Sequence, residues 1–181
     1  MELGPGPGTN FQCWAQGHGM TEWVGIEPNA HFEVALSAAK REHQLEELPT
    51  QLKHVRGEEL DVSAKSMDTV VAVHVLCSVD DVRAVLKEVE RVLKPGGKFL
   101  FLEHVLDPDP KSWRAMVQHA LSPMFNILAN GCKFQHTSQE LEIWAGRFGL
   151  DLQFEHVLAP MPLWPLRPHI LGSATKPLTG K

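Results

Sequence analysis

The sequence is poor in cysteine, and the cysteines that it has are widely spaced. Cys13, Cys77 and Cys132 are odd in number and lie far apart in the chain. A disulfide framework or a zinc site needs cysteines that are even in number or clustered at short spacing. The pattern therefore favours reduced intracellular thiols. The ten histidines are scattered, without the i, i+4 pair and accompanying acid of a helical metal site, so we expect no bound metal.

Basic charge and long apolar runs are also scarce. A net charge of -5 and a pI near 6.0 leave no basic footprint, so nucleic acid is not expected as the main partner. The longest apolar run, Val70 to Val79, contains His74 and is far too short to span a bilayer. The start of the chain does not have the pattern of a signal peptide.

The length and composition are those of an ordinary globular protein. A chain of 181 residues is long enough to bury a sizeable core and predicts a single domain over residues 1–181. A hydrophobic fraction of 43% and a charged fraction of 22% argue against disorder. No internal repeat or linker divides the chain.

Predicted strands and helices alternate for most of the length. Strands are expected at 22–27, 53–56, 67–76, 98–104, 151–158 and 168–175, and helices at 9–18, 31–48, 80–93, 111–129 and from 137 onward. The helix after Asp80 and Asp81, either of which can cap it, has the clearest apolar stripe, and Lys94-Pro95-Gly96-Gly97 ends it. This order predicts an α/β fold with a mostly parallel sheet and an antiparallel C-terminal hairpin.

A glycine-rich loop follows the first residues. Gly4, Gly6 and Gly8 come directly after Glu2-Leu3, and Glu27 ends the next predicted strand nineteen residues later. Taken alone, the glycines indicate only a turn and Glu27 only a solvated strand end. In a doubly wound sheet, however, this spacing brings a carboxylate beside the first loop, where it can bind two ribose hydroxyls. Together the two features favour a nucleotide-containing ligand.

These segments resemble a known family. ELGPGPGTN, GIEPN, MDTVV and VLKPGG, in that order, resemble the class I S-adenosylmethionine-dependent methyltransferases, whose sheet is Rossmann-like. VLCSV at 75–79, EHV at 103–105, NGC at 130–132 and RPHI at 167–170 narrow the resemblance to the methyltransferase-like 7 group, the thiol S-methyltransferases. The resemblance covers essentially the whole chain. It implies methyl transfer from S-adenosyl-L-methionine to a small-molecule substrate, an apolar thiol.

The resemblance also implies roles for particular residues. Residues expected at the cofactor are Glu2, Gly4, Gly6, Gly8, Asn10, Glu27, Gly57, Glu58, His74 and Val75, with Glu2 supporting the loop. Two positions depart from the pattern of relatives. Arg56 stands where many relatives have an aspartate for the adenine amine, and Asn130, where related proteins have aspartate, cannot act as a base.

Transfer to a thiol requires a group that removes the thiol proton. The thiolate is the nucleophile, and an alkyl thiol is only a few per cent ionised at neutral pH. His104, at the end of a strand, is the first candidate for the base and His74 the second; the alternative for either is a structural histidine bonded to the backbone. Glu103 is expected on the opposite face of the strand from His104.

Other reactive or apolar side chains have simpler interpretations. Cys77 and Cys132 show no histidine pairing in the sequence, so we interpret them as small buried hydrophobes. Several large apolar side chains could line a substrate pocket, but we expect most of them to pack in the core. They are Trp113, Met116, Met124, Phe125 and Trp144.

The position of the glycine loop carries a further expectation. In this fold the loop follows a central strand, of which only Met1-Glu2-Leu3 precedes it, so the first strand is expected to be largely missing. Relatives carry a hydrophobic anchor to the endoplasmic reticulum or lipid droplets upstream; membrane attachment would then depend on a segment outside this sequence. Two alternative functions stay open: methylation of a small hydroxyl or lipid substrate, and a catalytically silent fragment that acts as an interaction partner.

Overall fold

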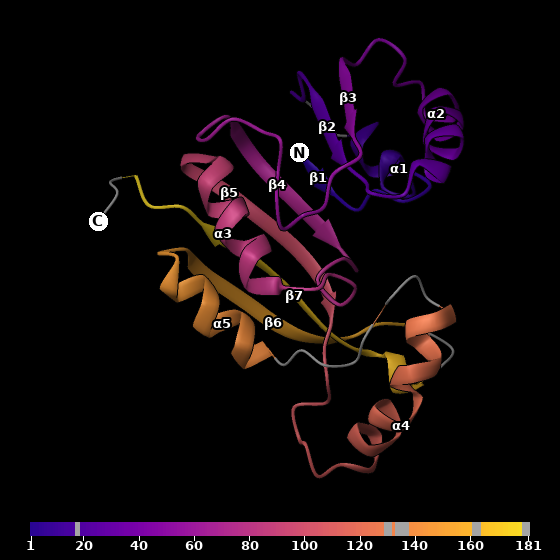
Figure 1. Cartoon of the computed structure of the whole chain (residues 1–181), viewed down its shortest axis with the longest axis vertical. Coiled ribbons are helices and arrows are strands. Elements are labelled where there is room, and N and C mark those ends of the chain that lie inside the picture. The colour runs from indigo at the N-terminus through magenta and orange to yellow at the C-terminus, as the bar shows by residue number, and fades with distance from the viewer. Residues whose placement is uncertain (17–18, 129–131, 133–137, 161–163, 179–181) are drawn as a thin grey trace.

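Seven strands form one sheet in the computed structural model, which describes residues 1–16, 19–128, 132, 138–160 and 164–178. Their order across the sheet is β3-β2-β1-β4-β5-β7-β6 (Figure 1). The strands are β1 (Glu2–Leu3), β2 (Trp23–Ile26), β3 (Thr50–Lys53), β4 (Met67–Val73), β5 (Leu93–His104), β6 (Asp151–Leu158) and β7 (Pro168–Thr175). Strands β1 to β5 pair in parallel, whereas β7 pairs antiparallel to both β5 and β6. The expected α/β sheet with its antiparallel C-terminal hairpin is confirmed.

The short β1 strand lies at the centre of the sheet. Glu2 and Leu3 are in register with β2 on one side and with β4 on the other. Met1 extends this pairing, because its carbonyl accepts a hydrogen bond from the Val71 N–H and its amino group donates to the Thr69 carbonyl. The strand therefore delivers the glycine loop to the middle of the carboxyl edge of the sheet.

Helices cover the sheet as the sequence pattern predicts. They are α1 (Phe11–Trp14), α2 (Glu33–Glu42), α3 (Val82–Val92), α4 (Trp113–Leu128) and α5 (Ser138–Arg147), with short 3₁₀ turns η1 (Ala30–Phe32) and η2 (Trp164–Leu166). The apolar stripe of α3 is buried against the sheet, and Asp81 rather than Asp80 caps the helix by accepting from the Arg83 and Ala84 N–H groups. Helices α3 and α5 lie on the same side of the sheet, while α4 lies beyond the carboxyl end of β5 (Figure 1).

Several element boundaries differ from the expected ones. Helix α2 ends at Glu42 instead of continuing to residue 48, because the chain turns through Gln44 at φ 56° and the Leu45 N–H returns to the Lys40 carbonyl. Strand β3 lies earlier than residues 53–56, where it pairs with the whole of β2. The turn expected at 94–97 is part of β5; Gly96, at φ 79°, and Gly97 exchange backbone hydrogen bonds with Lys176.

Thr137, where the last predicted helix was expected to begin, lies outside the described residues, and so does Asn130. Within the described part of the chain, no helix combines the length and hydrophobicity that crossing a membrane requires.

Candidate active site

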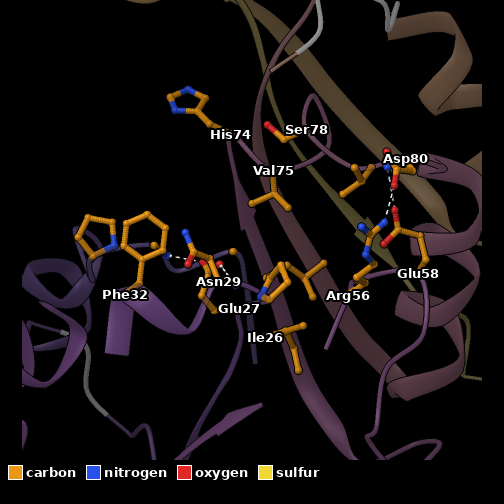
Figure 2. A pocket seen from close by; sticks show the side chains of 17 residues that line it. Ile26, Glu27, Asn29, Phe32, Arg56, Glu58, His74, Val75, Ser78 and Asp80 are labelled. Atoms are coloured by element: carbon orange, nitrogen blue, oxygen red, sulfur yellow. Dashed lines mark hydrogen bonds and ion pairs between the residues drawn. The ribbon is translucent and has the colours of Figure 1, made fainter. Parts of the chain in front are cut away.

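A cavity of about 510 Å³ opens at the carboxyl edge of the sheet, beside β1, β2 and β4 (Figure 2). Its lining residues fall in four segments, at 3–7, 26–32, 56–58 and 74–80, each of which follows a parallel strand. The order of the strands reverses between β1 and β4. Open α/β sheets bind ligands at this kind of reversal, because the loops from the two neighbouring strands diverge there.

The glycine loop needs glycine for two physical reasons. Gly4 and Gly6 line the cavity, with φ angles of 56° and 52° that residues with a Cβ adopt only at a cost. At Gly4 a Cβ would also lie 2.7 Å from Val75 Cγ2, so β1 and β4 approach too closely there for any side chain. Gly8 does not line the cavity; a Cβ there would lie 2.9 Å from the Ala39 Cβ, so Gly8 lets α2 pack against the loop.

Glu27 lies at the end of β2 with its carboxylate against the loop. Its Oε2 accepts from the Gly6 N–H and its Oε1 accepts from the Asn29 N–H, both at 3.0 Å. The residue is only 6% exposed, yet it lines the cavity. A carboxylate oxygen has more than one lone pair, so each oxygen can accept a further hydrogen bond from a ligand hydroxyl.

Glu2 supports the loop from behind and does not line the cavity. Its carboxylate accepts from Asn10 Nδ2 at 2.8 Å and from the indole N–H groups of Trp14 and Trp23 at 2.8 and 2.9 Å. Asn10 likewise faces Glu2. The sequence predicted that Glu2 supports the loop. It did not predict a role for the two tryptophans, whose indole N–H groups supply hydrogen bonds that this buried carboxylate needs.

The side of the cavity formed by residues 56–58 carries a positive charge on Arg56 and a negative charge on Glu58. Glu58 Oε1 accepts from the backbone N–H groups of Asp80 and Asp81 at 2.8 and 3.3 Å, and Arg56 forms an ion pair with the Asp80 carboxylate. Figure 2 shows this group at one side of the cavity, away from His74. Gly57 also lines the cavity. These contacts fix the segments after β3 and β4 relative to one another.

Glu103 holds the segment after β4 from inside the protein. It is 1% exposed, and its Oε1 accepts from the Val75 N–H at 2.9 Å. Burial and, to a smaller extent, the neighbouring Cys77 raise the pKa of Glu103 to about 8, against the opposing effect of backbone N–H donors from residues 75–77. Among the described residues its Oε2 has no hydrogen-bond partner.

Three histidines from different strands meet beside the cavity. The rings of His74, His104 and His169 have centroids 4.4 to 5.7 Å apart, and His74 Nε2 lies 2.9 Å from His169 Nε2. Of the three, His74 lines the cavity. His104 Nε2 lies 2.6 Å from the Leu166 carbonyl. The sequence named His74 and His104, but His169, within the RPHI motif, had no expected role.

Cys77 and Cys132 are buried, as expected, but they are not isolated from the histidines. Cys132 Sγ lies 3.8 Å from His104 Nδ1, a proximity that was not evident from the sequence. A hydrogen bond between the two thiols lowers the pKa of Cys132 and raises that of Cys77.

Comparison with known proteins agrees with this geometry. Residues 1–101 match the family model described as a methyltransferase domain. Human thiol S-methyltransferases TMT1B and TMT1A are each 37% identical to the chain, over 183 and 180 residues that cover 97% of the chain and 70% of the relative. A crystal structure of an S-adenosylmethionine-dependent methyltransferase from Methanosarcina mazei has a TM-score of 0.73 at 19% identity, covering 98% of this chain and 92% of that one.

The chain belongs to the S-adenosylmethionine-dependent methyltransferases. The cavity of this methyltransferase fits its cofactor on two observations: the loop backbone is exposed to the cavity at Gly4 and Gly6, and a buried carboxylate, Glu27, faces the same space. Within the part of the chain that the structure describes, no group of three or more histidine, cysteine or acidic side chains could hold a metal ion.

Several cavity residues of the methyltransferase had no predicted role. Asn29, Phe32, Ser78 and Val79 all line the cavity. Asn29, Ser78 and Val79 lie in loops that follow strands, and Phe32 ends the 3₁₀ turn η1 after β2, so the sequence signal was their position after a predicted strand, not their residue type.

The apolar residues considered for a substrate pocket lie elsewhere. Trp113, Met116 and Met124 are exposed on α4, so the expectation that they form the core was wrong for them. The Trp113 ring packs against Trp164 with centroids 4.0 Å apart. Trp144, on α5, packs beside Phe148 and against the hydrophobic core.

Proposed function

We propose that this methyltransferase transfers the methyl group of S-adenosylmethionine to a small apolar thiol. The observation that carries the proposal is the pair of human relatives at 37% identity over 97% of the chain, both named thiol S-methyltransferases. The site supplies a supporting feature: an imidazole, His74, at the cavity wall beside the loop that follows β4.

We assign the cofactor to the cavity through seven of the residues named from the sequence. Gly4 and Gly6 offer backbone contact, Glu27 accepts hydrogen bonds from the ribose hydroxyls, Gly57-Glu58 lies along the adenine side, and His74 and Val75 line the cavity from the segment after β4. Glu2, Gly8 and Asn10 act indirectly, by holding the shape of the loop.

The bound cofactor supplies a methyl group already activated on a sulfonium, so the protein mainly has to orient the acceptor and remove its proton. An alkyl thiol with a pKa of about 8.5 needs a base at neutral pH. We assign this role to His74 in preference to His104, because His74 lines the cavity whereas the Nε2 of His104 is bonded to the Leu166 carbonyl.

The experiment is incubation of the full chain with S-adenosylmethionine and a panel of alkyl thiols, phenols and quinol lipids, with the methylated products identified by mass spectrometry. Thioethers are the expected products. Turnover of phenols or lipids without turnover of thiols would show that the acceptor class is wrong. Binding of S-adenosylhomocysteine without turnover of any acceptor would favour a silent binding protein.

A further inference from the structure

His74 and His169 form a hydrogen-bonded couple whose direction is fixed by the backbone. The Nδ1 of His169 lies 2.9 Å from the Arg167 carbonyl, which can only accept, so His169 carries its proton on Nδ1. In a neutral ring its Nε2 is then the acceptor, and the Nε2 of His74, 2.9 Å away, must be the donor. The lone pair of His74 therefore resides on Nδ1.

The backbone of His74 is held in an unusual conformation. Its φ angle is 55°, in the left-handed region that residues other than glycine rarely adopt. The His74 N–H nevertheless donates to the Leu102 carbonyl, so the residue is tied to β5 at the point where β4 ends. Strain of this kind persists where surrounding contacts impose it, and it is concentrated at functional sites. Here it sets the ring between the cavity and His169.

We propose that His169 is a positioning residue for methyl transfer, which fixes His74 in the tautomer with Nδ1 available to the acceptor thiol and takes over the proton through Nε2. This inference rests on the proposed function of the cavity. It gives a role to a histidine that is only 1% exposed and contacts the site through His74.

The transfer balances without any further reactant. His74 Nδ1 accepts the thiol proton, and His74 Nε2 passes its own proton to His169 Nε2. The sulfur lone pair forms the new bond to the methyl carbon, and the electron pair of the broken carbon–sulfur bond stays on the cofactor sulfur. The products are a thioether, S-adenosylhomocysteine and a proton on His169, which is released to water during turnover.

The surroundings of the couple keep both rings neutral before the transfer. The pKa of His74 is lowered to about 4. The largest cause is burial of its ring, followed by repulsion from the imidazoles of His169 and His104. His74 is thus neutral at physiological pH and stays neutral beside a cationic methyl donor if its proton moves on to His169. Burial also lowers the pKa of His169; the Arg167 carbonyl opposes that effect, and the His104 imidazole adds to it. The other charged groups lining the cavity have partners of their own: Glu27, Arg56, Glu58 and Asp80.

The tautomers can be read directly in the full-length wild-type protein. A long-range ¹H–¹⁵N correlation spectrum of the histidine side chains, recorded at neutral pH and assigned with His74→Gln and His169→Gln, should show His169 protonated on Nδ1 and His74 on Nε2. His169 protonated on Nε2, or His74 on Nδ1, would overturn the proposal whether or not any thiol is methylated.

The kinetic test uses two probe thiols. Propanethiol is mostly protonated at neutral pH, whereas thiophenol is largely ionised there. His169→Gln, which keeps a hydrogen-bonding group but cannot take a proton, should lower kcat for propanethiol about 10- to 100-fold. It should lower kcat for thiophenol less than about threefold, with KM for S-adenosylmethionine unchanged. The loss with propanethiol should shrink as the pH is raised toward the thiol pKa.

His104→Gln is the matched control. His104 packs against the His169 ring at 4.4 Å, so its replacement perturbs the same cluster and should affect both thiols to the same extent. If His169→Gln also lowers kcat for both thiols to the same extent, His169 contributes only packing, and the proposal is overturned. If the wild-type protein binds S-adenosylhomocysteine but methylates neither thiol, the proposed function fails, and the spectrum still decides the tautomers of the couple.

Discussion

Glu103 accepts a hydrogen bond from the backbone N–H of Val75 at 2.9 Å, and so joins the end of β5 to the wall of the cavity. The side chain of the same Val75 contacts Gly4 so closely that a Cβ on the glycine would lie 2.7 Å from it. A buried carboxyl group on one strand therefore sets the position of the glycine loop two strands away.

We expect the stability of the protein to depend on pH through Glu103. Its pKa is raised from 4.5 to about 8, so between these values the unfolded chain has lost a proton that the folded protein retains. The contribution of Glu103 to the free energy of unfolding should therefore fall as the pH rises from about 4.5 to about 8, by up to about 1.4 kcal/mol per pH unit.

Glu103→Gln keeps an acceptor for Val75 but cannot ionise, so it should gain stability relative to the wild type as the pH rises. The measurement is urea unfolding of both proteins at about pH 6 and about pH 8. Glu142→Gln, at an exposed position on α5, is the control. A difference between Glu103→Gln and wild type that is the same at both pH values would contradict the raised pKa.

The loop glycines allow the backbone cost to be separated from the steric cost. Gly6→Ala should cost about 1–2 kcal/mol of stability, because φ is 52° but the added methyl group meets open space. Gly4→Ala has a similar φ and the additional contact with Val75, so it should cost more and should also weaken the binding of S-adenosylhomocysteine. Val75→Ala in the Gly4→Ala background should recover most of the difference. Equal unfolding free energies for Gly4→Ala and Gly6→Ala would rule out the steric contribution.

The histidine cluster should make the protein sensitive to acid. The pKa of His74 is lowered from 6.5 to about 4, and burial also lowers the pKa values of His104 and His169. At His74 the unfolded chain binds more protons than the folded protein between about 6.5 and about 4, so the contribution of this histidine to stability is present above 6.5 and decreases as the pH falls through this window, opposite in direction to the contribution of Glu103.

Proton uptake on unfolding at about pH 5.5, measured by calorimetry in buffers of different ionisation enthalpy, should be smaller in His74→Asn than in the wild type. His31→Asn, at an exposed position, should leave the uptake nearly unchanged. An uptake in His74→Asn equal to that of the wild type would mean that His74 titrates normally in the folded protein.

Local sequence signals predicted most of the fold. The α3 stripe and the capping aspartate depend on residues near one another in the chain, and both appear as expected. The boundaries of α2, β3 and β5 were missed where tertiary pairing decides the outcome. Residues 94–97 have the composition of a turn, yet pairing with Lys176, far along the chain, makes them part of a strand.

Site residues were predictable where their position directly after a strand places them at the edge of the sheet. The sequence placed Gly4, Gly6 and Glu27 at one edge of the sheet, and all three line the cavity. It could not place His169, because the contact with His74 joins residues 95 positions apart. Nor could the sequence show which of His74 and His104 is the better candidate for the base. That choice depends on the contact between His104 Nε2 and the Leu166 carbonyl, which lies far along the chain.

The central claim, that the cofactor binds in this cavity with its ribose at Glu27, is tested most directly by calorimetric titration of the full chain with S-adenosylhomocysteine. Wild type and Glu22→Ala, which alters an exposed carboxylate just before β2, should bind alike. Glu27→Ala should bind more weakly by about 1.5–3 kcal/mol, roughly 10- to 150-fold, because charge-assisted hydrogen bonds are lost while the fold is retained. A dissociation constant for Glu27→Ala equal to that of the wild type would contradict the claim.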